Sequence, residues 1–306
     1  MNQTAIVTRT VVTGACLIPL LCLPGRAVAA DIDEVLEADA NGRVTVSIIS
    51  GSIEVEGWER EEVRVTGTYE DDVEEFIFDR DGREITIRIK APDRGWGRQD
   101  VSAYLVIRVP HDNSLDIATV SSDIEVAAVR GEQELQSVSG NIVTTAYGSD
   151  IDAETVSGDV EVEAANGGGS AEWSLSSVSG DITGRGLAGD MRSEVVSGDI
   201  EIEGGTFVRV AAESVNGDIT FVGGLADDAR MNMETVNGAI DVMFEGPLSA
   251  DFDIETFNGN IRNCFGPKPE RTSKYAPGLE LGFTEGDGGA RVSLSTLNGS
   301  LEICKR

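Results

Sequence analysis

One short segment recurs through most of the chain, and it constrains the fold more than any other feature. Each copy places Ser-Gly or Asn-Gly before an alternating apolar run, as in TVSGDVEVEA, VVSGDIEIEG and SVNGDITF. The corresponding positions are Gly51, Ser122, Gly140, Gly158, Gly180, Gly198, Gly217, Gly238, Gly259 and Gly299. A period of about 20 residues held over so many copies indicates a stacked repeat architecture.

Apolar residues alternate within each copy, which is the period of a β-strand. Ile182 and Ile200 lie two residues after their glycines, and Val162 and Ile202 lie four residues after theirs. The residues before each glycine alternate in the same way. Each copy therefore predicts two short strands joined at the glycine, and the chain is expected to be all-β.

Two folds fit this pattern: an antiparallel β-meander or sandwich built from hairpins, and a parallel β-solenoid with the glycine at a corner. The residue two positions before the glycine is apolar in every copy. These residues are Val120, Val138, Val156, Val178, Val196, Val215, Val236, Phe257 and Leu297. In a two-residue hairpin this residue would pair with a polar Asp or Asn, whereas at a solenoid corner it would point into the coil. We therefore predict the solenoid and keep the meander as the alternative.

The two ends depart from the repeat. Residues 30–118 contain longer strand-like runs and are expected to form an antiparallel β cap, because a stack needs protected ends. Residues 119–304 are expected to form the solenoid. The segment FGPKPERTSKYAPG is rich in proline and basic residues, so residues 266–278 are expected to be a loop inserted in the last repeat.

The first 29 residues have the features of a secretory signal peptide. Arg9 precedes a short apolar run, and Ala27-Val28-Ala29 follows with a small-x-small cleavage pattern. A lipoprotein signal is the alternative, because Cys16 and Cys22 lie in the apolar run, although the residues before them are poor for lipidation. No later segment is apolar enough to span a membrane, so the mature chain is expected to lack an integral membrane segment.

Charge narrows the classes of partner. The whole chain has 24 Lys and Arg and 54 Asp and Glu, and removing residues 1–29 removes two arginines, which leaves 22 − 54 = −32. Such an acidic surface repels nucleic acid and anionic lipid, and it suits cations and basic proteins.

Cys264 and Cys304 are the only cysteines after the predicted signal peptide, and both lie five residues after their glycine. If their coils are adjacent, the Cα atoms would be about 5 Å apart, within reach of a disulfide. If another coil lies between them, the bond could not form without distortion. We predict the disulfide, which suits an oxidising compartment.

The runs GRVTVSIISGSIEVEGWEREEVRVTG and LVIRVP, the SGDI and NGDI repeats, and GGARVSLSTLNGSLEI resemble a bacterial domain-of-unknown-function family. Its members carry the name putative adhesin and have β-strand repeats. The resemblance covers nearly the whole mature chain and implies an exported β-repeat protein of the cell envelope. It brings no catalytic residues, so adhesion is itself a hypothesis.

Aspartates follow the glycine in successive repeats, at Asp159, Asp181, Asp199 and Asp218. Their carboxylates could share Ca²⁺ between coils. The structural alternative, which we favour, is that each Asp accepts a hydrogen bond from a backbone N–H at its own turn. Calcium binding is therefore kept as the alternative, and no other cofactor is expected.

Other candidate residues are few. Trp96 in DRGWGRQD and Tyr275 in the basic insertion could contact a protein or glycan, and packing is the alternative role. His111 is the only histidine, and no partner residue marks a catalytic site around it. With 54 acids, any carboxylate pair is uninformative as evidence for glycan hydrolysis.

We therefore expect a non-enzymatic, exported cell-envelope protein that presents an acidic β surface to an envelope protein or glycan, as an adhesin would. The alternatives are a periplasmic scaffold or sensor-associated protein and, less favoured, a polysaccharide-active enzyme. The chain shows no autotransporter-size barrel sequence after the repeats and no C-terminal anchor. On that basis we expect the periplasm rather than the cell surface or the medium.

Overall fold

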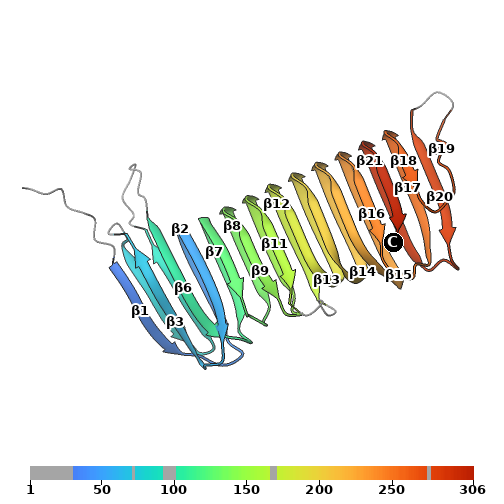
Figure 1. The fold of residues 1–306 in the computed structure, drawn as a ribbon. Helices are drawn as coiled ribbons and strands as arrows, with labels where there is room; N and C mark the ends of the chain where they lie inside the picture. Colours follow the sequence, from blue (N-terminus) through green and yellow to red (C-terminus); the bar gives the residue numbers. More distant parts are fainter. Residues whose placement is uncertain (1–29, 71–72, 92–100, 166–170, 274–276) are drawn as a thin grey trace, which may run out of the picture.

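The computed structural model describes residues 30–70, 73–91, 101–165, 171–273 and 277–306, and within them it contains strands and loops but no helix (Figure 1). The predicted signal peptide, residues 1–29, lies outside the described residues. In the described part of the chain, accordingly, no helix is long and apolar enough to cross a membrane.

The repeats form a parallel β-solenoid in which each coil contributes one strand to each of two sheets (Figure 1). We call the strands before the corner glycines the front sheet and those after them the back sheet. The front sheet contains β8 (Gln133–Ser139), β10 (Ile151–Ser157) and β12 (Glu172–Ser179), and the back sheet contains β9 (Ile142–Ala146), β11 (Val160–Ala164) and β16 (Ile240–Phe244). Three longer strands run from the back sheet into the front sheet: β13 (Ile182–Ser197), β14 (Ile200–Asn216) and β15 (Ile219–Asn237).

Equivalent positions of the repeat lie in register in neighbouring coils. In the back sheet, Ile182 pairs with Val160 on one side and Ile200 on the other, and the pairing continues to Ile219 and Ile240. All of these pairings are parallel. The predicted parallel β-solenoid is therefore confirmed, and the antiparallel meander is wrong for the repeats.

At the N-terminal end, the stacking order differs from the chain order. The first coil-like strand, β2 (Arg43–Trp58), pairs in parallel with β7 (Ser114–Ala127) on one side and with β5 (Glu84–Lys90) and β6 (Ser102–Pro110) on the other. Antiparallel strands extend this end of the sheets. The strand β4 (Glu75–Asp81) pairs with β5, β3 (Glu62–Tyr69) pairs with β6, and β1 (Ala30–Glu37) pairs with β3.

Residue 118, the predicted boundary between cap and solenoid, lies inside β7. The three-part division of the chain remains a prediction.

The C-terminal end repeats this reversal of order. The last coil, made of β21 (Ala290–Asn298) and β22 (Leu301–Lys305), lies between the coil of β15 and β16 and the coil of β17 (Ala250–Asn258) and β18 (Ile261–Asn263). The insertion adds β20 (Leu279–Glu285), which is antiparallel to β17, and the short β19 (Glu270–Arg271). Figure 1 shows the C-terminus inside the stack, with β20 and β19 beyond it.

Apolar side chains fill the space between the two sheets. The positions two and four residues after the glycine are buried, as Ile200 and Ile202 illustrate. Toward the C-terminal end aromatic rings replace aliphatic ones, with Phe207 and Phe221 5.4 Å apart between ring centroids, and Phe252 stacked on Phe283 at 4.4 Å. The core is one continuous column along the stack rather than a globular centre.

The apolar residue two before each glycine does not point into the coil, and this part of the sequence interpretation is wrong. Val120, Val156, Val196 and their equivalents are exposed by 40–49%. The inward position belongs to the residue before it, which is Ser or Thr in most copies. The hydroxyl of Thr235 donates to the carbonyl of Gly217 in the neighbouring coil at 3.0 Å, and Ser177 does the same to Gly158 at 3.0 Å. The backbone carbonyl at the corner needs a donor, so a polar side chain takes the inward position.

The corner glycines are required because the backbones of successive coils come close there. A Cβ on Gly198 would lie 2.2 Å from the carbonyl oxygen of Gly180, and the φ angle of Gly198 is +151°. A side chain would clash with a backbone that cannot move away without opening the stack. This explains the repeated glycine better than turn preference alone does.

Candidate binding groove

A groove with a volume of about 770 Å³ runs along the front sheet beside the corners. Its floor contains the exposed apolar residues of six coils, which we call the apolar column. In stacking order these are Val178, Val196, Val215, Val236, Leu297 and Phe257. The groove crosses the strands, so it follows the axis of the solenoid.

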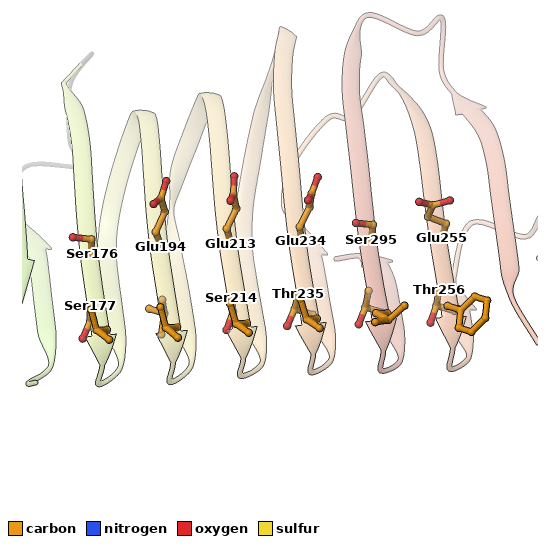
Figure 2. A pocket seen from close by; sticks show the side chains of 18 of the residues that line it. Ser176, Ser177, Glu194, Glu213, Ser214, Glu234, Thr235, Glu255, Thr256 and Ser295 are labelled. Carbon is orange, nitrogen blue, oxygen red and sulfur yellow. The ribbon is translucent and has the colours of Figure 1, made fainter. Parts of the chain in front are cut away.

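A second column runs beside the apolar one, two residues earlier on each strand. Because side chains alternate along a strand, these residues share the outward face with the apolar column. We call this second set the acidic column: Ser176, Glu194, Glu213, Glu234, Ser295 and Glu255. Figure 2 shows Glu194, Glu213 and Glu234 in consecutive coils, with Ser295 between Glu234 and Glu255.

The carboxylates of the acidic column are only partly compensated. Glu194 accepts a hydrogen bond from the guanidinium of Arg192, and Glu234 accepts one from the Nδ2 atom of Asn232 at 3.1 Å. No hydrogen bond or ion pair from the described residues reaches Glu213 or Glu255. Carboxylates in adjacent coils repel by about 0.9 kcal/mol each at the dielectric constant of water, so this column favours a cationic neighbour.

The groove has one closed end. At the C-terminal end of the stack, Thr272 and Gly278 of the insertion line it beside Phe257. The backbone N–H of Thr272 donates to the carbonyl of Gly278 at 3.1 Å, which closes the base of the insertion. A bound molecule therefore meets a boundary at this end.

Farther from the corners, the same front strands carry a row of cations. Arg209, Arg230 and Arg291 are aligned in successive coils, between Asp190 and Asp251. Arg209 forms an ion pair with Asp190 at 3.3 Å. This row therefore has cations in its three central coils and an aspartate at each end.

The four aspartates considered for calcium binding form a chain of inter-coil hydrogen bonds. Asp159 Oδ1 accepts the backbone N–H of Asp181 at 2.9 Å, Asp181 accepts that of Asp199, and Asp199 accepts that of Asp218, both at 2.8 Å. These bonds agree with the favoured interpretation, in which each Asp accepts a backbone N–H, except that the N–H belongs to the next coil and not to the turn of the same Asp. The hypothesis that they also bind Ca²⁺ stays a prediction.

Among the described residues, the one group of potential ligand atoms close enough for a metal ion is Cys264, Glu302 and Cys304. The two cysteines form the predicted disulfide, with Cα atoms 4.9 Å apart, so their sulfur atoms are committed to each other. Because the last coil lies beside β18, the bond joins neighbouring coils.

The remaining sequence candidates are Trp96, Tyr275 and His111. Trp96 and Tyr275, the two predicted aromatic contacts, lie outside the described residues. The Nδ1–H of His111 donates to the carbonyl oxygen of Ala128 at 2.6 Å, and its Nε2 atom lies 3.6 Å from the carboxylate of Glu59. It therefore takes part in packing near the N-terminal end.

The sequence interpretation missed the groove, although the signal is present in the aligned repeats. Glu stands four residues before the glycine at Glu154, Glu194, Glu213, Glu234 and Glu255. The same alignment shows the apolar column, which was assigned to the interior. Both columns are visible once the inward position is given to the Ser or Thr.

Three solved structures are similar to this chain. The putative cell adhesion protein from Clostridium sporogenes ATCC 15579 is 11% identical, covering 90% of this chain and 100% of its own, with a TM-score of 0.21. The putative adhesin from Bacteroides fragilis NCTC 9343 is 12% identical, covering 89% and 96%, with a TM-score of 0.43. The putative adhesin from Parabacteroides distasonis ATCC 8503 is 10% identical, covering 90% and 97%, with a TM-score of 0.37. These likenesses are weak, and the fold rests on the strand pairing described above.

Among curated proteins, none matches this chain. A family model does match part of it: residues 107–194 match the family described as Toastrack DUF4097. The matched residues run from β6 into β13 and include the first four corners with an exposed valine, Val120 to Val178. The match confirms the predicted resemblance to a domain-of-unknown-function family, and residues 107–194 are the part of the chain that is similar to Toastrack DUF4097.

Proposed function

We propose that this chain is a non-enzymatic, exported protein of the cell envelope that binds a partner in the groove of the front sheet. The observation that carries the proposal is the apolar column, whose side chains range from 40% exposed at Val236 to 49% exposed at Phe257. Contiguous exposed apolar patches rimmed by polar residues often mark sites that contact another molecule, whereas single exposed apolar residues do not. Adhesion, the role that the family resemblance implies, is one form of such binding.

Three further properties support this proposal. The predicted signal peptide and the Cys264–Cys304 disulfide suit an exported, oxidised protein. The net charge of −30 disfavours nucleic acid and anionic membrane surfaces as partners. The groove volume lies within the range of about 300–1,000 Å³ that is usual for binding sites.

The test is binding of the labelled mature chain to isolated envelope fractions of the host. Val196→Asp with Val215→Asp should weaken binding about 30-fold or more, because two half-buried apolar contacts are lost and like charge is added. Val208→Asp is the control, since Val208 is 49% exposed, close to the 45% of Val196 and 42% of Val215, and does not line the groove. Equal loss in both variants, or no loss in either, would remove the groove from the proposal.

A periplasmic scaffold is the second candidate, and it differs from an adhesin only in location. Protease treatment of intact host cells separates the two. Digestion without lysis would favour an adhesin, and protection until lysis would favour the scaffold. Cleavage of an envelope polysaccharide by the purified chain would instead require the enzyme alternative.

A further inference from the structure

The groove also indicates what kind of partner it holds. We propose that its occupant is an amphipathic, cationic α-helix of a partner protein, lying along the stack with its apolar side chains on the apolar column. This inference rests on the proposed function and names the partner of the same site.

The strands beneath the groove cannot bind a partner by β-strand addition. The front strands under it already pair on both sides, as β13 does with β12 and β14, and β14 does with β13 and β15. Their backbone N–H and C=O groups are therefore used, and a partner cannot add a strand there. The occupant must be read by side chains, which is how a helix is held in a groove.

The spacing of the apolar column fits a helix better than an extended chain. Successive coils are about 4.8 Å apart. One face of an α-helix repeats every turn of about 5.4 Å, so the mismatch is about 0.6 Å per coil. One face of an extended strand repeats about every 6.7 Å, so its mismatch is about 2 Å per coil and register is lost within two or three coils.

The length of the groove sets the size of the helix. The apolar column crosses six coils, from Val178 to Phe257, and so spans about 24 Å. A helix of about 16 residues has this length. The insertion residues Thr272 and Gly278 mark where it stops.

The charge of the groove defines the flank of the helix. The acidic column lies two residues from the apolar column along each strand, which is about 7 Å. A helix has a radius of about 5–6 Å including its side chains, so the acidic column lies just beyond the edge of a helix seated on the apolar column, within reach of a long Lys or Arg side chain. Lys or Arg on that flank would meet Glu194, Glu213 and Glu234 in successive coils and would relieve the repulsion between them.

The experiment uses the full mature chain and three synthetic 16-residue peptides, each followed by fluorescence anisotropy. The first is a Leu/Lys peptide patterned for an amphipathic helix, the second replaces each Lys with Glu, and the third has the first peptide's composition in a strict two-residue alternation. Binding of the first alone is expected. Equal binding of the Leu/Glu peptide, or stronger binding of the alternating peptide, would overturn the proposal.

A matched pair of variants separates the groove from the general negative charge of the chain. Glu194→Gln, Glu213→Gln and Glu234→Gln together should weaken binding of the Leu/Lys helix about tenfold. Glu125→Gln, Glu161→Gln and Glu201→Gln remove the same charge from the back sheet and should change it less than about twofold. Equal effects of the two triple variants would show nonspecific attraction and overturn the proposal.

Failure of this inference is distinguishable from failure of the proposed function. If Val196→Asp with Val215→Asp abolishes envelope binding while no helical peptide binds, the groove holds something else, such as a glycan, and only the helix is wrong. If the same double variant instead converts a self-associated chain into monomers by sedimentation, the occupant is a second copy, and the helix is again wrong.

Discussion

The two outward faces of the solenoid are built from the same repeat but treat charge in opposite ways. On the back sheet, acids alternate with other residues from coil to coil, as in Glu161, Thr183, Glu201 and Thr220, and Arg185 pairs with Glu161. On the front sheet, three glutamates stand in successive coils beside an exposed apolar column. Most acids of this back-sheet column are therefore separated or paired within the molecule, whereas three front-sheet glutamates stand in adjacent coils.

The largest effect should come from breaking the corner that both faces share. Gly198→Ala places a Cβ 2.2 Å from the carbonyl oxygen of Gly180 at a φ of +151°. We expect a loss of about 3 kcal/mol in the free energy of unfolding, measured by denaturant titration, together with loss of groove binding. Gly205→Ala is the control, because its nearest new contact is the side chain of Ala188 at 3.4 Å. A cost for Gly205→Ala equal to that for Gly198→Ala would contradict the stacking explanation.

The next effect tests why the front sheet turns its valines outward. Thr235→Val removes the donor to the Gly217 carbonyl and should cost about 1–2 kcal/mol in unfolding free energy. Val195 occupies the equivalent inward position with no hydroxyl, and the buried Ser193 Oγ two residues earlier has no hydrogen-bond partner in the described part of the chain.

The reverse exchange should therefore stabilise the chain. Val195→Thr combined with Ser193→Ala supplies a donor at the corner and removes an unpaired hydroxyl from the core. We expect the free energy of unfolding to rise by about 1 kcal/mol, which calorimetry would detect as a higher Tm. A fall in Tm would show that the hydroxyl at this position is not what orients the corner.

A smaller effect should appear where the back sheet departs from its alternation. Burial, then Glu302 in the adjacent coil and Asp218, raises the pKa of Asp241. Because the folded-state pKa is raised, ionising Asp241 costs stability, and the cost appears as pH rises from about 3.9 through the folded-state pKa.

Asp241→Asn should consequently stabilise the chain at pH 7, by less than about 1 kcal/mol because the group is largely solvated. The gain should disappear near pH 3, where the aspartate is protonated in both states. Glu201→Gln, whose neighbours in the same column are Thr183 and Thr220, is the control and should show no such gain. A gain that does not change with pH would contradict the electrostatic cause.

The smallest effect compares the two faces directly. Glu213→Gln relieves repulsion from Glu194 and Glu234 and should raise the unfolding free energy by about 0.5 kcal/mol at low salt. The gain should vanish in 1 M NaCl, while Glu201→Gln on the back sheet should be neutral at both concentrations. If Glu213→Gln is neutral at low salt, the front glutamates do not strain the free chain.

Much of the fold follows from the aligned repeats. The period predicts the stack, and the alternation around Ile182 and Ile200 predicts the interior of the back strands, as observed. The place of Cys264 and Cys304 in the repeat predicts their bond once their coils are neighbours.

The groove and the order of the coils did not follow from the same reasoning. Apolar character alone does not say whether Val196 points in or out, because the corner interrupts the strand alternation and a hydroxyl can be buried if it has an acceptor. The coils also share one pattern, so nothing local in the sequence shows that Leu297 lies between Val236 and Phe257. Stacking order is a non-local property of equivalent layers.

The placement of the last coil has a consequence for how the molecule is made. Among the described strands, the coil of β17 and β18 pairs with the last coil, β21 and β22, and not with the coil of β15 and β16 that precedes it in the chain. During synthesis, the coils up to Phe244 could stack in chain order. The next coil in the stack could form only after the final residues of the chain have been synthesised and released from the ribosome. A chain that ends after residue 289 would therefore lack an internal coil, and the coil of β17 and β18 would lose the parallel strands with which it pairs.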